Sequence, residues 1–282
     1  MSAPKKHLFV FDIETVPDLD AGRRLLDMQG APDDEVDIAL RAYHLEVTEG
    51  RNDFLRQPFW KVVAISYVQA QVERVDESQA KGGGEVRFTL TRVGSGGDAD
   101  SSEKDLVEGF FRHLEQKKPR LVSFNGRTFD LPVLKYRAMV HGLSAPHFFD
   151  TSNKWENYTQ RYADAWHADL LETLSDYGAS ARVRLDEVSR TLSLPGKLGT
   201  SGGDVAPLFA AGRIDDIRNY CETDVVNTYL LFLRWELLRG TISPASHEAS
   251  VLEMANYLET ERAERPHLGE FLDAWRLMEH SA

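Results

Sequence analysis

Cysteine is nearly absent from this sequence, which has a single one, Cys221, among 282 residues. A single cysteine excludes an internal disulfide framework. Long apolar runs are also missing, since none approaches the roughly 20 residues that a helix needs to cross a bilayer. The apolar run near the N-terminus is too short for a secretory signal and carries acidic residues. We therefore expect a soluble protein of the reducing cytoplasm, with no membrane partner.

Positive charge is also scarce. The chain has 33 Lys and Arg residues against 45 Asp and Glu residues, which gives a formal net charge of −12. Tight, nonspecific binding of duplex nucleic acid needs Lys and Arg to neutralise phosphates, so this balance argues against that class of protein. A bound divalent cation would reverse the sign of the field wherever carboxylates cluster. We expect modest affinity for any nucleic acid, with contacts confined to one groove.

Apolar residues make up 42% of the chain and aromatic residues 10%, enough for a sizeable core. Patterns typical of strands gather in the first half, at 7–12, 61–70, 86–94 and 120–125, with a turn at 75–85. Residues 18–57 predict a loop and a short helix. Patterns typical of helices lie within 94–118, 131–142, 167–178, 184–194, 204–212 and 213–240, with two more helices in the tail.

Strands in the first half and helices in the second indicate one α/β fold with a central mixed sheet. The sequence contains no internal repeats and no convincing linker between domains. We predict that residues 1–240 form the main domain and that residues 241–282 form a helical extension packed on it.

Two carboxylates stand one residue apart where the first apolar strand ends, in the stretch "FVFDIETVPD". Side chains two positions apart on a strand point to the same face, so Asp12 and Glu14 can converge on one point. Like charges beside a core repel each other, and without a cation one of the two carboxyl groups should have a raised pKa. Ordinary surface placement does not explain this pair well.

Three further residues have suggestive settings. Asp130 follows the fourth predicted strand, in "NGRTFD", where a helix N-cap is the ordinary alternative and, taken alone, the better one. Asp224 lies in the predicted 213–240 helix, where an acid is usually on the surface. Tyr220 stands one helical turn before Asp224, so the phenol and the carboxylate share a helix face. Taken alone, this tyrosine would usually be half-buried packing.

A pair of hard divalent cations would offset the repulsion between these acids. Mg²⁺ and Mn²⁺ take carboxylate oxygens and keep several waters for a substrate phosphate. Two such ions that flank a phosphodiester activate the attacking water and stabilise the departing 3′ oxygen. This scheme requires carboxylates from different elements to meet at one point, and it gives Tyr220 the task of orienting the water.

Three motifs, in order along the chain, resemble those of the DEDD superfamily of 3′–5′ exonucleases: "FDIET", "NGRTFD" and "YCETD". The tyrosine of the third motif indicates the DEDDy branch. The second motif looks most like that of the proofreading domains of family B DNA polymerases. The chain is similar to stand-alone predicted exonucleases related to those domains, closely over about residues 7–240 and more loosely in the tail.

This resemblance implies an RNase H-like fold: a five-stranded mixed sheet, with its first three strands antiparallel, flanked by helices and followed by extra C-terminal helices. It implies that Asp12, Glu14 and Asp224 hold a first divalent ion. Asp12 would also bridge to a second ion, with Asp130 acting partly through water. Because the sequence carries no polymerase module, the enzyme would work alone or with a separate polymerase or repair partner.

The resemblance also implies substrate contacts. Thr15 and Asn125 would contact the 3′-terminal nucleotide, and Phe129 would stack on a base or its sugar, with core packing as an equal alternative. The Gly-rich stretch "LPGKLGTSGGDV" would let Lys197 touch a phosphate, although a mobile connector explains it equally well. Weaker candidates are Arg182 and Arg184 for the same groove, and Asp169 of "HAD", for which a helix N-cap is the better interpretation than a metal ligand.

The leading hypothesis is therefore a metal-dependent 3′–5′ exonuclease that acts on single-stranded DNA. An exoribonuclease or oligonucleotide-trimming enzyme of the same fold is the alternative within the class, because the motifs do not decide between the two sugars. A non-catalytic nucleic-acid-binding module on a relic nuclease fold is a second alternative, and the retained acids argue against it. A metal-free glycoside hydrolase ranks last, since it leaves the Tyr–Asp helix without a role.

Overall fold

The computed structural model of the chain describes residues 5–75, 85–199 and 202–279. Its strands form one sheet, and they are β1 (His7–Pro17), β2 (Trp60–Val75), β3 (Glu85–Ser95), β4 (Arg120–Ser123) and β5 (His167–Asp169). Most of the turn predicted at 75–85 lies outside the described residues.

The order of the strands across the sheet is β3-β2-β1-β4-β5. β1 pairs with β2, and β2 with β3, in antiparallel ladders, whereas β4 pairs in parallel with both β1 and β5. The expected RNase H-like fold, a mixed sheet whose first three strands are antiparallel, is therefore confirmed. β1 lies at the centre of the sheet, so its C-terminal end is reached from both faces.

One expected helix was wrong in part. The segment 167–178 was predicted as a helix, but its first three residues are the fifth strand, and they are followed by the short α-helix α5 (Leu170–Leu174) and the 3₁₀ turn η2 (Asp176–Gly178). All three strand residues are buried beside β4, and the ladder to β4 fixes their extended conformation. A strand of three residues is too short for its alternation to be read from a sequence.

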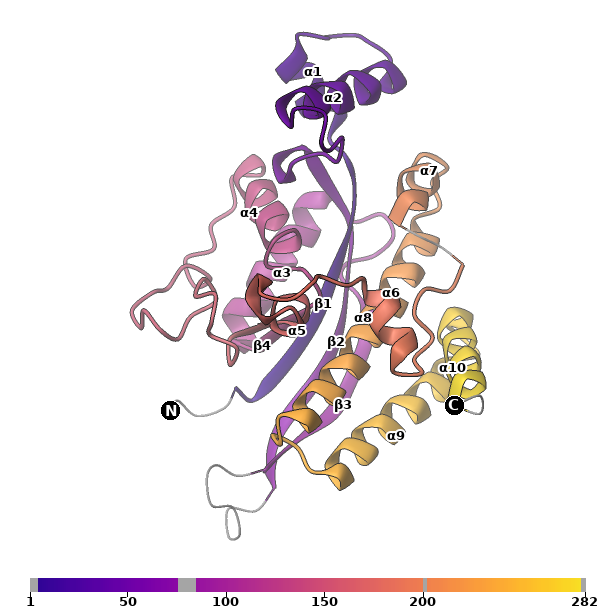
Figure 1. The fold of residues 1–282 in the computed structure, drawn as a ribbon. Coiled ribbons are helices and arrows are strands. Elements are labelled where there is room, and N and C mark those ends of the chain that lie inside the picture. Colours follow the sequence, from indigo (N-terminus) through magenta and orange to yellow (C-terminus); the bar gives the residue numbers. More distant parts are fainter. Residues whose placement is uncertain (1–4, 76–84, 200–201, 280–282) are drawn as a thin grey trace.

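Helices cover both faces of this sheet, as Figure 1 shows for α8 and α9 on one side and α3 and α4 on the other. The helices of ten or more residues are α2 (Asp33–Val47), α3 (Glu103–Lys117), α4 (Asp130–Val140), α8 (Ile214–Leu238), α9 (Pro244–Glu261) and α10 (Pro266–Glu279). The shorter helical segments in the described part are α1 (Leu19–Leu26), η1 (Gln57–Phe59), α5, η2 (Asp176–Gly178), α6 (Leu185–Thr191), η3 (Gly202–Asp204) and α7 (Val205–Ala210).

The segment 18–57 is more helical than its sequence predicted. The predicted short helix corresponds to α2, the segment also contains α1, and the turn η1 begins at its last residue. In α2, Val36, Leu40 and His44 are buried at intervals of four residues, which is one stripe of a helix. The scattered apolar residues that suggested a loop are therefore the single inward face of a mostly polar helix.

Alternation along β1 gives the sheet two different cores. Leu8 and Val10 point toward α8 and join the core that includes α9 and α10. Phe9, Phe11 and Ile13 point the other way, into the core shared with α3 and α4. Because Asp12 and Glu14 continue the series of Leu8 and Val10, they lie on the face covered by α8.

The C-terminal helices are joined to α8 and β3 by polar contacts. The Glu222 carboxylate of α8 accepts hydrogen bonds from Arg265, from the His267 imidazole at 2.7 Å and from Ser95 of β3 at 2.8 Å. From α9, the Ser250 hydroxyl donates to the Phe88 carbonyl of β3 at 2.8 Å. The proposed boundary between a domain at 1–240 and an extension at 241–282 stays a prediction, while these contacts describe how the two segments meet.

A buried ion-pair network fixes α4 against α3 and α1. The guanidinium of Arg137, on α4, donates to Glu103 at the start of α3, at 2.7 Å, and to Asp18 at the start of α1. The side chains of all three residues are at most 9% exposed. Because α4 also carries Asp130, this network positions one of the predicted site residues.

We predict that Arg137→Ala lowers the free energy of unfolding by about 3–5 kcal/mol, because it leaves two buried carboxylates without their cation. Chemical denaturation followed by circular dichroism measures the loss. The matched control is Arg41→Ala, which removes a half-exposed pair with Asp37 at 2.8 Å. The control should cost less than about 1 kcal/mol, and equal losses in the two variants would contradict this interpretation of the network.

Candidate active site

The first two acids lie at the open end of β1. Asp12 is half-buried and Glu14 is 8% exposed. The register to β2 shifts directly after Glu14: Glu14 pairs with Ala64 and Thr15 with Val62, so Val63 is left as an extra residue. A bulge of this kind bends and twists a strand, and bulges are frequent beside active sites. Here the bulge follows directly after the acid pair.

Asp130 reaches the same point from α4. β4 pairs with β1 only from Leu8 to Val10, so the backbone of β1 beyond Val10 has no strand beside it on that side. The Asp130 Oδ1 atom fills this place and accepts the Ile13 N–H, between Asp12 and Glu14, at 3.2 Å. Asp130 is the first residue of α4 and not its N-cap, so the capping alternative considered for this residue is wrong.

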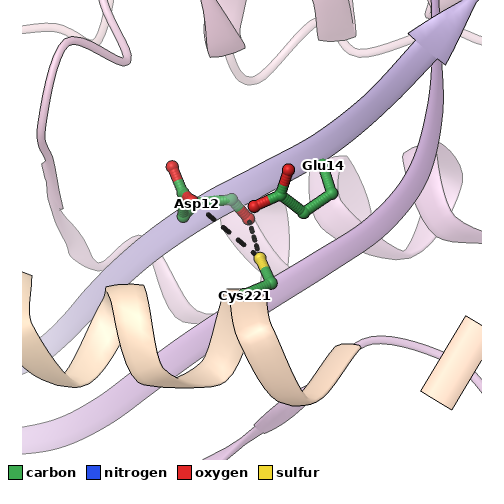
Figure 2. A group of neighbouring side chains, drawn as sticks. All are labelled: Asp12, Glu14 and Cys221. Carbon is green, nitrogen blue, oxygen red and sulfur yellow. Dashed lines mark hydrogen bonds between the residues drawn. The ribbon is translucent and has the colours of Figure 1, made fainter. Parts of the chain in front are cut away.

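The helix α8 supplies the third group. Tyr220 and Asp224 are both 6% exposed and lie one helical turn apart on α8, so the phenol is close to the carboxylate. Cys221 lies between them, with its Sγ atom 3.6 Å from the Asp12 carbonyl oxygen and 4.0 Å from Asp12 Oδ2. Figure 2 shows this thiol on α8 directed at the two acids of β1. The sequence motif "YCETD" contains Cys221, but it gave no signal of that contact.

Lys197 also contacts the candidate site. Its Nζ atom donates to the Tyr220 hydroxyl at 2.5 Å and lies 3.9 Å from Asp224 Oδ2. The lysine was expected to touch a phosphate from a Gly-rich loop, of which residues 200–201 lie outside the described residues. In this structure its ammonium group neutralises part of the charge of the acids.

The acids repel one another strongly. Burial, followed by the charges of the neighbouring carboxylates, raises the pKa of Asp12 well above its usual value, and burial with the charge of Asp224 does the same for Glu14. Burial raises the pKa of Asp130 to about 7 and that of Asp224 to about 6. The charge of Lys197 acts against these shifts at Asp12, Glu14 and Asp224.

The donor set fits a divalent ion. Among the described residues, Asp224 Oδ1 is buried and has no hydrogen-bond partner. A buried carboxylate oxygen without a partner is costly unless a cation or a donor reaches it. The carboxylates are hard oxygen donors of the kind that Mg²⁺ and Mn²⁺ prefer. Burial raises the pKa of the Cys221 thiol, which therefore stays protonated and is a poor ligand.

Three of the predicted substrate-binding residues, Thr15, Asn125 and Phe129, form no hydrogen bond to the acids of the carboxylate cluster in the described structure. Thr15 is half-buried and follows the bulge. The half-buried ring of Phe129 has its centroid 5.7 Å from that of Phe54 and 6.0 Å from that of Trp60, which favours its core-packing alternative. Asn125 accepts a hydrogen bond from the Thr128 hydroxyl within its own turn. Their contacts with a nucleotide stay predictions.

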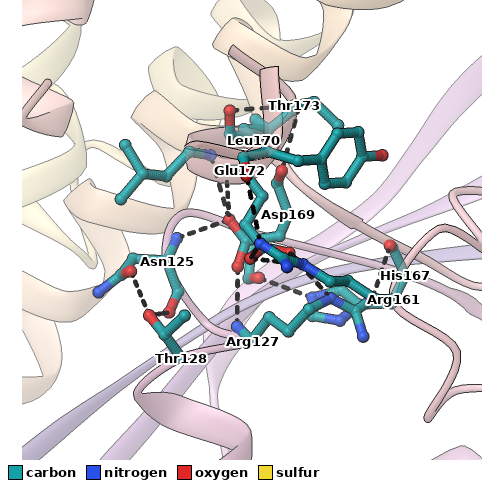
Figure 3. A network of polar contacts seen from close by, with 12 residues as sticks. Asn125, Arg127, Thr128, Arg161, His167, Asp169, Leu170, Glu172 and Thr173 are labelled. Atoms are coloured by element: carbon teal, nitrogen blue, oxygen red, sulfur yellow. Dashed lines mark hydrogen bonds and ion pairs between the residues drawn. The ribbon is translucent and has the colours of Figure 1, made fainter. Parts of the chain in front are cut away.

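The turn that carries the second motif is held by Asp169. Its carboxylate accepts the backbone N–H groups of Asn125 at 3.0 Å and Arg127 at 2.8 Å, and it also caps α5. Figure 3 shows this carboxylate at the centre of the network. The capping interpretation of Asp169 is thus confirmed. The sequence gave no signal that the same side chain also fixes the turn that leads to Asp130.

Gly126 is required in this turn because of a close approach. A Cβ atom at this position would lie 2.5 Å from Ser123 Oγ and 2.6 Å from Ser123 Cβ. The serine is not free to move, since its hydroxyl is 2.7 Å from the buried His167 Nε2 atom. The glycine of the second motif therefore allows the chain to turn from β4 toward Asp130.

A mixed sheet of this order, with a carboxylate cluster at the end of its central strand, defines a nuclease of the RNase H-like class. The chain belongs to the family described as "Predicted 3'-5' exonuclease related to the exonuclease domain of PolB", which matches residues 52–275. The protein is thus an enzyme of the 3′–5′ exonuclease type, and the resemblance inferred from its motifs is confirmed. The match includes the second and third motifs and begins after Asp12 and Glu14.

Individual relatives are similar to half of the chain. The catalytic polypeptide of DNA polymerase epsilon from Dictyostelium discoideum is 27% identical over 143 residues, and that from Schizosaccharomyces pombe is 24% identical over 141. Each match covers 48% of this chain and 6% of the relative's length. The solved structure of the family B DNA polymerase of Pyrobaculum calidifontis is 16% identical, covers 91% of this chain and 30% of that one, and has a TM-score of 0.45.

We predict that Gly126→Ala destabilises the protein by about 1–3 kcal/mol through overpacking against Ser123, and lowers nuclease activity because Asp130 is displaced. The matched control is Gly109→Ala in α3, where a Cβ atom meets nothing within 4 Å. That change should stabilise the helix by about 0.5–1 kcal/mol. Thermal unfolding of both variants measures the difference, and a neutral Gly126→Ala would contradict the predicted clash.

We also predict that divalent metal stabilises the protein more at high pH. The raised pKa values of Asp130 and Asp224 mean that the folded chain binds these protons more tightly than the unfolded chain does. Their contribution to stability is therefore present at about pH 4 and lost as the pH rises to about 7. A cation that neutralises the ionised carboxylates restores it.

Scanning calorimetry with MgCl₂ or MnCl₂ against EDTA tests this prediction. Metal at about 100 times its Kd adds about 2.7 kcal/mol, which corresponds to a rise in Tm of about 5 °C for a chain of this size. The rise should be present at about pH 8 and small at about pH 5, and it should shrink in Asp224→Asn. An equal rise at both pH values would contradict the assignment of the acids to a metal site.

Proposed function

We propose that this exonuclease removes nucleotides from the 3′ end of single-stranded DNA by a mechanism that depends on two divalent ions. One observation carries the proposal: carboxylates from β1, α4 and α8 meet around the end of β1, and a tyrosine hydroxyl joins them. These elements lie far apart in the sequence, and no structural role in the fold requires their acids to share one buried volume.

Asp12, Glu14, Asp130 and Asp224 are the residues that would hold Mg²⁺ or Mn²⁺. Such ions, when bound, supply an activated water and stabilise the charge that develops on the scissile phosphate. The chain itself supplies a largely dry setting, in which fixed charges act more strongly than they do in water. It also supplies carboxylates whose pKa values are raised by burial and by one another's charge, a repulsion that a cation would offset.

Tyr220 is suited to position a water and not to take a proton from it. Burial and the charge of Asp224 raise the pKa of the phenol above its usual value, so the hydroxyl stays protonated. The hydroxyl accepts a hydrogen bond from Lys197, whose ammonium group also lies 3.9 Å from Asp224 Oδ2. A phenol oxygen has a second lone pair, which remains able to accept a hydrogen from a water molecule.

The relation of the family to a DNA polymerase domain supports DNA as the substrate. The similar curated proteins are catalytic polypeptides of a DNA polymerase, which also supports a separate polymerase or repair partner for this chain. We further propose a cytoplasmic location, supported by the single cysteine. None of the helices in the described ranges has both the length and the apolar character that a membrane crossing requires.

Digestion of end-labelled oligonucleotides, as matched DNA and RNA strands, tests this function. We predict release of mononucleotides from the 3′ end with Mg²⁺ or Mn²⁺, and faster release from DNA than from RNA. Asp12→Asn and Asp224→Asn should each lower the rate by more than about 100-fold. Tyr220→Phe should lower kcat by about 10-fold or more with little change in KM.

The control is Asp215→Asn, an exposed acid in the first turn of α8, which should leave the rate unchanged. Faster digestion of RNA would favour the exoribonuclease alternative. Metal binding without release from either strand would favour a non-catalytic binding module. Release that persists in both site variants would contradict the proposed site.

A further inference from the structure

A basic groove of about 440 Å³ lies beside the second motif, outside the carboxylate cluster. It is bordered by α4, by the long connector that follows α4 and by α5. Four of its lining side chains are basic: Arg127, Lys135, Arg161 and Arg182. Glu172 is the acid among them. In a chain with a formal net charge of −12, such a concentration of positive charge is unusual.

Internal ion pairs leave much of this charge available. Glu172 is buried and serves two guanidinium groups at once, that of Arg161 at 2.8 Å and that of Arg127 at 3.5 Å. Figure 3 shows both arginines beside this carboxylate. Within the described ranges, Lys135 and Arg182 have no hydrogen-bond or ion-pair partner. Glu172, together with the nearby Asp169 carboxylate that acts on Arg127, therefore balances these two arginines, and the two unpaired side chains are free to meet an anion.

The position of the groove links it to the candidate active site. Arg127 and Thr128 line it, and they belong to the turn that ends at Asp130. Asp169 holds that turn through the Arg127 backbone N–H. A strand whose 3′ end reaches Asp130 from this side would therefore pass the groove with the nucleotides that precede the end.

An exposed aromatic ring beside Arg161, one of the lining residues, indicates which anion fits the groove. The Tyr162 side chain is 64% exposed, and the Arg161 guanidinium lies 5.8 Å from the centre of its ring. Tyr177 packs edge-on against the same ring, with the two ring centroids 4.9 Å apart. A positively charged groove with an aromatic ring at its edge is the arrangement that binds unpaired nucleic-acid strands, in which the backbone meets cations and the bases stack.

We propose that this groove binds the phosphodiester backbone of the single-stranded substrate upstream of its 3′-terminal nucleotide, with Tyr162 as a stacking platform for a base. The identity of the strand rests on the function proposed above. The groove itself rests on its own charges and its own aromatic ring. The groove would make the affinity depend on the length of the strand, because only a longer strand reaches it. The hydrolysis itself takes place at the carboxylate cluster.

Fluorescence anisotropy with a labelled oligodeoxythymidylate tests the groove. Calcium replaces magnesium so that the strand is not degraded, which gel electrophoresis of the same samples verifies. In the double variant Lys135→Ala with Arg182→Ala, affinity should fall roughly tenfold, and the slope of log K against log[salt] should become less steep by about 1.4, or about 0.7 for each lost phosphate contact. The matched control, Lys104→Ala with Arg112→Ala on the exposed side of α3, should change neither quantity.

Tyr162→Ala separates stacking from charge. It should weaken binding roughly fivefold or more without altering the salt slope. Strands too short to span both sites should bind the wild type and the double variant equally. The proposal would be overturned if the slope of log K against log[salt] were the same in the double variant as in the wild type. It would also be overturned if a mononucleotide displaced the oligonucleotide from the wild type but not from the double variant.

These outcomes are distinct from those of the proposed function. If the protein shows no nuclease activity but its affinity for the oligonucleotide still falls in the groove variants, the proposed function is wrong and the proposed groove stands. If the double variant digests long and short strands at the wild-type rate, the proposed groove is wrong and the proposed function stands. Circular dichroism verifies that the variants fold, and neither Lys135 nor Arg182 has a hydrogen bond or ion pair in the described residues that the fold would lose.

Discussion

Mutual repulsion of carboxylates in a poorly solvated place is the constraint on which this structure depends. Asp12 and Glu14 stand at the end of a central strand, where the core would otherwise continue. Asp130 and Asp224 are brought to them from opposite faces of the sheet. The protein offsets this cost with a backbone N–H from Ile13 and the ammonium group of Lys197. These partners are too few, since one oxygen of Asp224 remains unpaired in the described structure.

The surrounding fold can be understood as the means of holding these acids in place. Pairing with β2 on one side fixes β1, and the early end of β4 opens its other side to Asp130. Two layers of support stand behind Asp130: the carboxylate of Asp169, which fixes the preceding turn, and the guanidinium of Arg137, which fixes the helix. Rigid elements thus carry the charged groups, which reduces the freedom of the acids to move apart.

Much of this arrangement could be predicted from the sequence, because it depends on local periodicity. The alternation along β1 predicted that Asp12 and Glu14 share one face of the sheet. The spacing of one helical turn predicted that Tyr220 and Asp224 share one side of α8. Groups that act through tertiary contacts gave no such signal. Lys197 meets Tyr220 from a separate loop, Cys221 meets Asp12 across the interface of helix and sheet, and Asp169 fixes a turn more than 40 residues before it. The strand β5 was missed because only its neighbour β4 makes it extended.

Glu222 connects the far end of the chain to the centre of the molecule. It lies between Tyr220 and Asp224 on α8, yet its carboxylate points away from them and is bound by Arg265 and His267 near the start of α10. The C-terminal segment thus holds α8, the helix that carries Tyr220 and Asp224, in place. In a chain shortened at Gly240, the buried carboxylate of Glu222 would lose both Arg265 and His267, within one helical turn of Tyr220 and Asp224. The integrity of the site therefore depends on the C-terminal segment.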